Sequence, residues 1–189
     1  MTIHFMRSLT VTQPWAGLIA AEIKLIENRR RPLIKRSDFG KPFAIHASRE
    51  IDEAVYDRCK EIVGVADGPT EANRMFHGWG DPEQPEWQRW YRLTRITSAV
   101  IAVATIDAVL ITEKHGIADH DPDARSPLPA DQRRWFLGPV GYVLRDVRVL
   151  DTPVACRGWQ GFWYLTPKEQ RERGQVSSVE RAVQEQVAC

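Results

Sequence analysis

Three ionisable residues near the start of the chain, Lys24, Glu27 and Arg29, have the types and spacing to act on a polar ligand. On a strand, Glu27 and Arg29 share one face because side chains alternate with a period of two. A lysine in a cleft beside a carboxylate can bind phosphate or, once desolvated, act as a base. Glu27 can pair with either cation or with the exocyclic amine of a nucleobase. A solvated lysine beside a structural ion pair is the other interpretation, and both stay open here.

Five other residues could extend such a site. Trp15 opens the first predicted helix and could stack on a base, a contact worth ~1–3 kcal/mol, although such a tryptophan more often packs in the core. Ser48 is predicted to cap a helix that starts at Arg49. A helix N-terminus is also an anion site, so phosphate could bind there beside Arg49. Arg157 and Gln160 adjoin glycines, which permit close backbone approach, so both could lie against a ligand.

Charge is balanced over the whole chain but not locally. The 26 lysines and arginines against 25 acidic residues give a net charge of +1. A protein that coats nucleic acid non-specifically is usually strongly basic. Residues 24–41 nevertheless contain seven basic and two acidic residues, a local charge of +5. This favours a local nucleic-acid site of defined shape over non-specific coating of nucleic acid. A solvated charged surface is the alternative.

Metal and nucleophile signatures are weak. The loop over residues 113–129 carries five residues that could ligate a divalent metal: His115, Asp119, His120, Asp121 and Asp123. Their spacing matches no recognised metal motif. We therefore predict no metal and no other cofactor, except that a ribonuclease could use a divalent metal. His46 lies in an apolar strand and Cys156 lacks a neighbouring base, so we expect a core histidine and an unreactive thiol.

The elements that would position these residues follow from hydrophobic periodicity and turn residues. We predict strands over residues 8–12, 24–30, 42–47, 99–111, 140–150 and 160–165. Thr12 is predicted to cap the first helix, and further helices cover 49–63 and 87–93, with loops over 64–84 and 113–129. Strands do not alternate regularly with helices, which favours an α+β fold with a curved or closed sheet over a doubly wound one.

Length and composition are those of one globular domain. A chain of 189 residues leaves room for insertions or a tail, and 43% hydrophobic with 27% charged residues excludes a disordered chain. The longest apolar run, residues 98–105, is far below the ~18 residues of a membrane span. Residues 1–7 show no basic start followed by an apolar stretch. We therefore expect a cytoplasmic protein with no membrane partner.

Several sequence pieces, taken together, resemble one known family. The chain opens with Leu-Thr-Val-Thr-Gln-Pro-Trp over 9–15, and a Lys-x-x-Glu-x-Arg step follows over 24–29. Ile-His-Ala-Ser lies at 45–48, and 156–163 reads Cys-Arg-Gly-x-Gln-Gly-x-Trp. In order and spacing these pieces resemble the ASCH domain, a branch of the PUA-like superfamily of RNA-associated β-barrels. The likeness runs from about residue 7 to residue 165, apart from two loop regions.

The resemblance implies an α+β fold, a PUA-like mixed β-barrel with flanking helices. One ASCH/PUA-like domain would cover 1–166, with loop insertions near 64–95 and 112–137 and a charged C-terminal tail over 167–189. A cleft between the barrel and the first helix would hold the base of a nucleotide or of single-stranded RNA. We therefore predict a protein whose partner is RNA, a nucleoside or a nucleotide. The predicted binding residues are Trp15, Lys24, Arg29, Ser48, Arg49, Arg157 and Gln160.

An enzyme is the alternative that the resemblance implies, either a ribonuclease or an acylcytidine amidohydrolase. One ASCH subgroup cleaves the amide of acylated cytidine with a lysine, a threonine three residues on and a later glutamate. Lys24 matches the lysine, Glu27 replaces the threonine, and Glu113 is a candidate for the glutamate. Lys24 and Glu27 would then be the catalytic proton-transfer pair. The family usually has glycine where this chain has Glu22. A left-handed backbone is costly for Glu, so we expect either a different turn or a helical conformation at this position.

Overall fold

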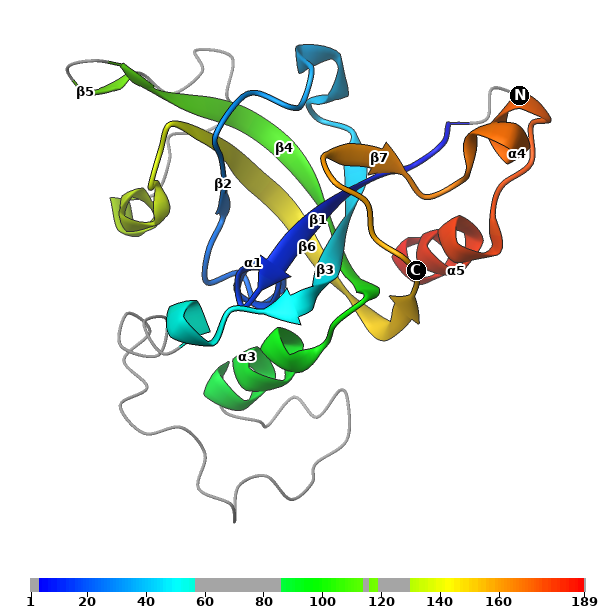
Figure 1. Cartoon of the computed structure of the whole chain (residues 1–189), viewed down its shortest axis with the longest axis horizontal. Coiled ribbons are helices and arrows are strands. Elements are labelled where there is room, and N and C mark those ends of the chain that lie inside the picture. The colour runs from blue at the N-terminus through cyan, green and yellow to red at the C-terminus, as the bar shows by residue number, and fades with distance from the viewer. Residues whose placement is uncertain (1–3, 57–85, 114–115, 119–129, 189) are drawn as a thin grey trace.

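The structure is a computed structural model and describes residues 4–56, 86–113, 116–118 and 130–188. Within these residues one mixed sheet contains seven strands: β1 (Arg7–Gln13), β2 (Ile26–Arg29), β3 (Pro42–Ile51), β4 (Ala99–Glu113), β5 (Gly116–Ala118), β6 (Val140–Ala155) and β7 (Phe162–Tyr164). Figure 1 shows the helices around it: α1 (Trp15–Ala20), α3 (Glu86–Arg95), α4 (Lys168–Glu172), α5 (Ser178–Val187) and the short 3-10 helices η1 (Arg36–Asp38) and η3 (Ala130–Trp135).

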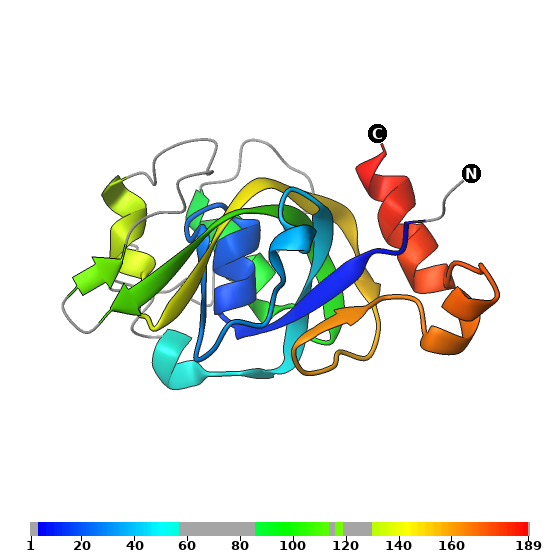
Figure 2. The same ribbon diagram turned by 90° about the horizontal axis from the view of Figure 1, so that it is seen from above.

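The sheet is curled rather than flat. Its strand order is β2-β6-β4-β3-β1-β7, with β5 added on β4. The β1–β3 pair is parallel and the other described pairs are antiparallel. The long strands β4 and β6 pair with three register shifts, and bulges of this kind bend a strand and increase its twist. The strands curve around α1 (Figure 2). The fold is therefore α+β with a curved sheet and flanking helices, as predicted, and the sheet forms a half-barrel.

The first helix fills the inside of the curl and is held by Gln13. α1 buries Leu18 and Ile19, which pack against the inner face of the sheet. The Gln13 side-chain oxygen accepts a hydrogen bond from the Gly17 backbone N–H at 2.9 Å, and its amide donates to the Leu93 carbonyl of α3 at 2.8 Å. The prediction that Thr12 caps this helix is therefore wrong. The buried Gln13 can bond α1 and α3 together, whereas Thr12 is exposed.

The third strand runs further than predicted, and this overturns the anion site at Ser48. β3 stays paired with β1 up to its last residue, so Ser48 and Arg49 lie in a strand and no helix begins there. The Ser48 hydroxyl donates to the Glu50 carbonyl at 2.9 Å. The next helical residues start after Asp52, whose carboxylate accepts a backbone N–H at 3.1 Å. Pairing between strands has overridden the local capping preference of serine.

The segment predicted as a charged tail forms α4 and α5, and α5 packs on the outer side of the sheet. Val183 and the carboxylate of Glu180 are fully buried there. Glu180 accepts hydrogen bonds from the Met6 backbone N–H at 2.5 Å and from the Thr166 hydroxyl. Its own backbone N–H donates to the Ser177 side chain, which caps α5. The predicted surface helix or frayed end is therefore a docked helix.

Of the other predicted segments, some lie within the described residues and some lie outside them. The helix predicted over 87–93 is α3, and the loop predicted over 113–129 contains the short strand β5. The loop predicted over 64–84 and the candidate metal ligands lie outside the described residues. Among the described helices, none combines the length and the apolar character needed to cross a membrane.

Candidate functional site

A cavity of about 220 Å³ opens between β1, β2 and the start of α1. Residues from all three elements line it, together with one residue of the turn between α1 and β2 and one residue that follows η3. The lining residues are Thr10, Val11, Thr12, Trp15, Lys24, Glu27, Asn28, Arg29 and Leu137. Four of the residues predicted from the sequence thus come together in one hollow: Trp15, Lys24, Glu27 and Arg29.

The Lys24 side chain is buried, with only 1% of its surface exposed. Its ammonium donates to the carbonyl of Ile26 and lies 3.5 Å from one carboxylate oxygen of Glu27. The same nitrogen lies 5.3 Å from the centre of the Trp15 ring, within cation–π range. The ammonium is therefore held at the cavity by a carbonyl, a carboxylate and an aromatic face. This excludes the interpretation of a solvated lysine at a strand start.

A tight turn after α1 positions Lys24 at the cavity. The backbone N–H groups of Ile23 and Lys24 both donate to the Leu18 carbonyl, at 3.0 and 3.2 Å. Glu22 lies between them and the helix with a φ of +62°, a left-handed conformation that glycine adopts far more readily. Glu22 therefore adopts the left-handed conformation despite its steric cost, and the expectation of a helical conformation or a different turn at this position is wrong.

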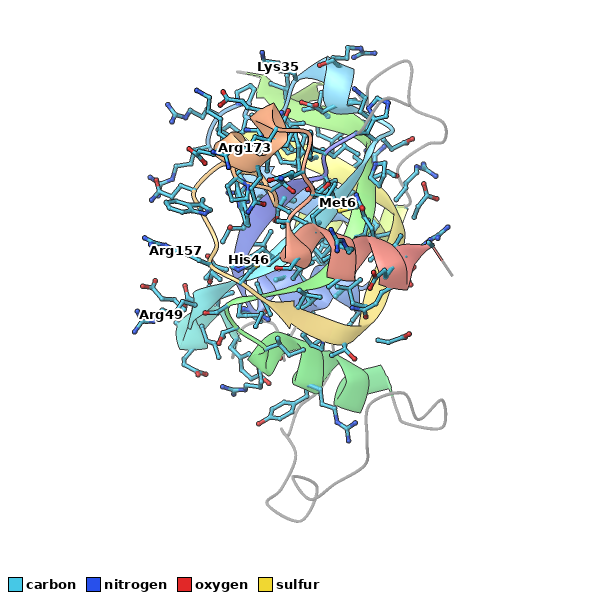
Figure 3. The ribbon with its side chains drawn as sticks, turned by 90° about the vertical axis from the view of Figure 1, so that its right-hand side faces the viewer. Met6, Lys35, His46, Arg49, Arg157 and Arg173 are labelled. Atoms are coloured by element: carbon cyan, nitrogen blue, oxygen red, sulfur yellow. The ribbon has the colours of Figure 1, made fainter. Side chains whose placement is uncertain are left out.

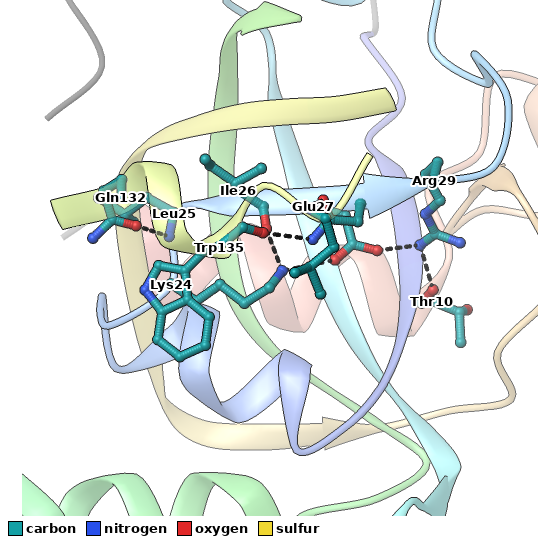
Figure 4. A network of polar contacts seen from close by, with 10 residues as sticks. Thr10, Lys24, Leu25, Ile26, Glu27, Arg29, Gln132 and Trp135 are labelled. Carbon is teal, nitrogen blue, oxygen red and sulfur yellow. Dashed lines mark hydrogen bonds and ion pairs between the residues drawn. The ribbon is translucent and has the colours of Figure 1, made fainter. Parts of the chain in front are cut away.

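The second cation of the site is Arg29. Arg29 and Glu27 share a face of β2 as predicted, and one Arg29 nitrogen lies 2.9 Å from the Glu27 carboxylate. The same nitrogen donates to the Thr10 carbonyl at 2.8 Å. Figure 4 shows the row that results, from Lys24 through Glu27 to Arg29 and Thr10. Two cations share one carboxylate, so the row carries one net positive charge beside the cavity.

An apolar rim faces these charges. Leu137 is 63% exposed, and Trp15 makes an edge-to-face contact with Trp135 at a centroid distance of 6.2 Å. Asn28 holds the rim in place: its amide donates to the Trp135 carbonyl, and its side-chain oxygen accepts from the Leu137 backbone N–H, both at 2.9 Å. Sequence reasoning missed Asn28, Leu137 and Thr10. Asn28 lies between Glu27 and Arg29, so strand alternation turns its side chain to the opposite side of β2 from theirs. A polar side chain at that position was the one signal in the sequence for a hydrogen bond to another segment.

Four predicted binding residues do not line the cavity. Ser48 and Arg49 lie in β3, and Arg157 and Gln160 are exposed on the segment between β6 and β7. The Arg157 guanidinium lies 4.5 Å from the centre of the Trp159 ring. These residues belong to a neighbouring surface rather than to the hollow that contains Lys24.

His46 and Cys156 are structural. His46 is 1% exposed, and its Nε2 lies 3.1 Å from the Cys156 carbonyl; a carbonyl only accepts, so Nε2 carries the proton. Burial lowers the pKa of His46 below its usual value of 6.5, and the bond to Cys156 opposes this only in part, so the ring is neutral. Burial also raises the pKa of the Cys156 thiol, which keeps it protonated at neutral pH.

Metal ligands are scarce in the part of the chain that the structure describes, where no three His, Cys, Asp or Glu side chains gather into a potential metal site. The five candidates of the loop at 113–129 lie outside the described residues, and so does the side chain of Glu113. No protein-family model matches this chain, and no curated protein matches it either.

Proposed function

We propose that the cavity holds a nucleobase and that the protein binds RNA or a nucleotide through a PUA-like cleft of the ASCH type. The observation that carries the proposal is the meeting of Lys24, Glu27 and Arg29 beside Trp15 in one hollow. The hollow lies between the curled sheet and the first helix, which is where the ASCH resemblance implies a ligand. The left-handed turn at Glu22, where that family usually has glycine, also supports the resemblance.

The size of the cavity suits a small flat ring. Its volume of about 220 Å³ is below the roughly 300 Å³ at which pockets for drug-sized ligands begin. It equals the liquid volume of about seven water molecules, at roughly 30 Å³ each. A single base can occupy such a space, while its sugar and phosphate remain at the mouth.

The polar groups match the edge of a base. Lys24 and Arg29 can donate to ring nitrogens and carbonyl oxygens, and Glu27 can accept from an exocyclic amine. The buried Nε–H of Arg29 has no hydrogen-bond partner among the described residues, and buried donors normally have one. Trp15 and Leu137 offer apolar contact to the faces of a ring. Because Lys24 is buried, we assign it to the base rather than to a phosphate.

Calorimetric titration with the four ribonucleoside monophosphates tests the proposal. Lys24→Met should weaken binding of the preferred nucleotide roughly 10- to 100-fold, because a hydrogen bond to a charged group contributes about 1.5–3 kcal/mol. Glu27 keeps Arg29 as its partner in this variant, which limits the loss of stability. Thr12→Glu adds a negative charge at an exposed cavity residue and should weaken binding about fivefold, for roughly 1 kcal/mol of repulsion.

Arg181→Gln is the matched control, because Arg181 is exposed on α5 away from the cavity. It should bind as the unmodified protein does. Equal affinities for all four proteins, or no binding of any nucleotide, would overturn the proposal.

Hydrolysis of a modified nucleoside or of RNA is the second candidate, favoured by the contact between the buried Lys24 ammonium and the Glu27 carboxylate inside the cavity. Such a pair can move a proton between an attacking water and a leaving group. Glu27 occupies the position of the subgroup's threonine, so that nucleophile is missing. Incubation with acylated cytidine, and with labelled single-stranded RNA with and without Mg²⁺ or Mn²⁺, tests this candidate. Turnover that Lys24→Met abolishes would support it, and intact substrates in every mixture would exclude it.

A further inference from the structure

An exposed tryptophan lies on the segment between β6 and β7. Trp159 is 54% exposed, although a large apolar ring is usually buried. The guanidinium of Arg157 lies 4.5 Å from its ring centre, so a cation and an aromatic face are presented together. Stacking platforms for single-stranded nucleic acid combine these two groups.

The segment that carries this pair is tightly packed on the sheet at Gly158. A Cβ placed on Gly158 would lie 2.3 Å from Cε1 of His46 and 3.0 Å from Oγ1 of Thr10. No side chain fits there, so the backbone lies directly on these two residues. The positions of Arg157 and Trp159, on either side of Gly158, are thereby set by the sheet.

Thr10 connects this segment to the cavity. Thr10 lines the cavity and is paired with His46 across β1 and β3. Its hydroxyl also accepts a hydrogen bond from Nε1 of Trp163 at 3.1 Å, just beyond the exposed segment. Thr10 therefore borders both the hollow and the segment around Gly158.

Arg49 lies at the same edge. The β1–β3 register passes from Val11↔Ala47 to Gln13↔Ile51, so the single residue Thr12 faces the three residues 48–50. Thr12 lines the cavity, so Arg49 lies on the strand segment beside one of its lining residues. Figure 3 shows Arg49 and Arg157 projecting from one edge of the molecule, with His46 behind them. The exposed charges of 48–50 and 157–160 are Arg49, Arg157 and one acid, Glu50.

We propose that Arg49, Arg157 and Trp159 form a second subsite for the neighbouring nucleotide of the same strand, so that the ligand is single-stranded nucleic acid rather than a free nucleoside. This rests on the proposed function, because the first base must occupy the cavity. The next base stacks on Trp159, and the two arginines contact phosphates. Stacking does not depend on base identity, so any sequence preference comes from the cavity.

Fluorescence anisotropy with labelled pentaribonucleotides rA5, rC5, rG5 and rU5, and with their deoxy counterparts, tests this subsite. Trp159→Ala should weaken pentanucleotide binding roughly 5- to 100-fold and leave the affinity for the monophosphate unchanged. Arg49→Gln and Arg157→Gln should each reduce the slope of log K against log salt by about 0.7, the value for one phosphate contact of a single strand. Ile111→Ala is the matched control, since Ile111 is 44% exposed at the far end of β4.

The outcomes separate the two proposals. If Trp159→Ala binds the pentanucleotides normally while Lys24→Met and Thr12→Glu weaken them, the subsite is wrong and the base site stands. If Trp159→Ala weakens the monophosphate as much as the pentanucleotide, the subsite is wrong because Trp159 then acts on the first base. If neither monophosphates nor pentanucleotides bind, both proposals fail together.

Discussion

Replacing Gly158 by alanine tests whether the segment before β7 is held against His46 as described. The added methyl would lie 2.3 Å from Cε1 and 2.5 Å from Nδ1 of the His46 ring, which is too close for any pair of carbons or nitrogens. The ring is buried and bonded to the Cys156 carbonyl, so it cannot swing away freely. Overpacking of this kind destabilises a protein by about 1–3 kcal/mol, and we expect Gly158→Ala to fall in that range.

A double-mutant cycle shows whether contact with His46 causes the loss of stability in Gly158→Ala. His46→Ala alone should lose about 2–5 kcal/mol through the cavity that it leaves. In the double variant the new methyl enters that space, so the loss should be smaller than the sum of the single losses by about 1–2 kcal/mol. Gly161→Ala is the contrast: its φ is +79° and nothing lies within 4 Å of an added methyl, so it should lose about 1–2 kcal/mol through backbone strain, with no coupling to His46.

Urea unfolding followed by far-ultraviolet circular dichroism measures each free energy. If Gly158→Ala is as stable as the unmodified protein, or if its loss is simply added to that of His46→Ala, the close packing is refuted. In that case the fixed position of Arg157 and Trp159 is refuted with it.

Two further predictions concern buried polar groups. Glu180→Ala should lower the free energy of unfolding by about 2–4 kcal/mol, because the Met6 N–H and the Thr166 hydroxyl lose a buried acceptor. Glu180→Gln keeps an acceptor and should lower the free energy of unfolding by less. Equal losses of stability for the two variants in urea unfolding would contradict this role of Glu180. Burial lowers the pKa of His46, so the unfolded chain binds its proton more readily: the stability that His46 provides is complete above pH 6.5 and declines as the pH falls below 6.5 toward the lowered pKa. Melting curves from about pH 7.5 to about pH 5.5 should show a steeper loss for the unmodified protein than for His46→Gln, and parallel losses would refute the assignment.

The fold was predictable where a segment carries its own strong pattern. The apolar runs that begin at Ala99 and Val140 predicted β4 and β6, but both strands are longer than predicted. β6 extends to Ala155 because its last residues pair with β4, and β4 extends to Glu113 because its last two residues pair with β5. At Ser48 the local pattern was misleading, since a capping residue before charged residues is typical of a helix start. Pairing with β1 and a hydrogen bond from the Ser98 backbone N–H to the Ser48 carbonyl keep the segment extended. The charged composition of α5 likewise hid a buried carboxylate at Glu180.

The site was predictable from local spacing and not beyond it. The spacing of Glu27 and Arg29 predicted a shared face, and their side chains do pair on β2, where Lys24 joins them from the preceding turn. Asn28 and Leu137 meet from positions 109 residues apart, and no local pattern could show that the segment after η3 forms the rim of the cavity. Thr10 was missed for a related reason: its carbonyl, rather than its side chain, accepts from Arg29, and any residue type supplies a carbonyl.

The most direct measurement of the central claim is a crystal structure of the protein with its best-binding pentanucleotide. The account predicts one base inside the hollow, with its polar edge in hydrogen-bond contact with Arg29 or Lys24 and the next base on the ring of Trp159. A bound strand that leaves the hollow unoccupied and lies on another face of the molecule would contradict it.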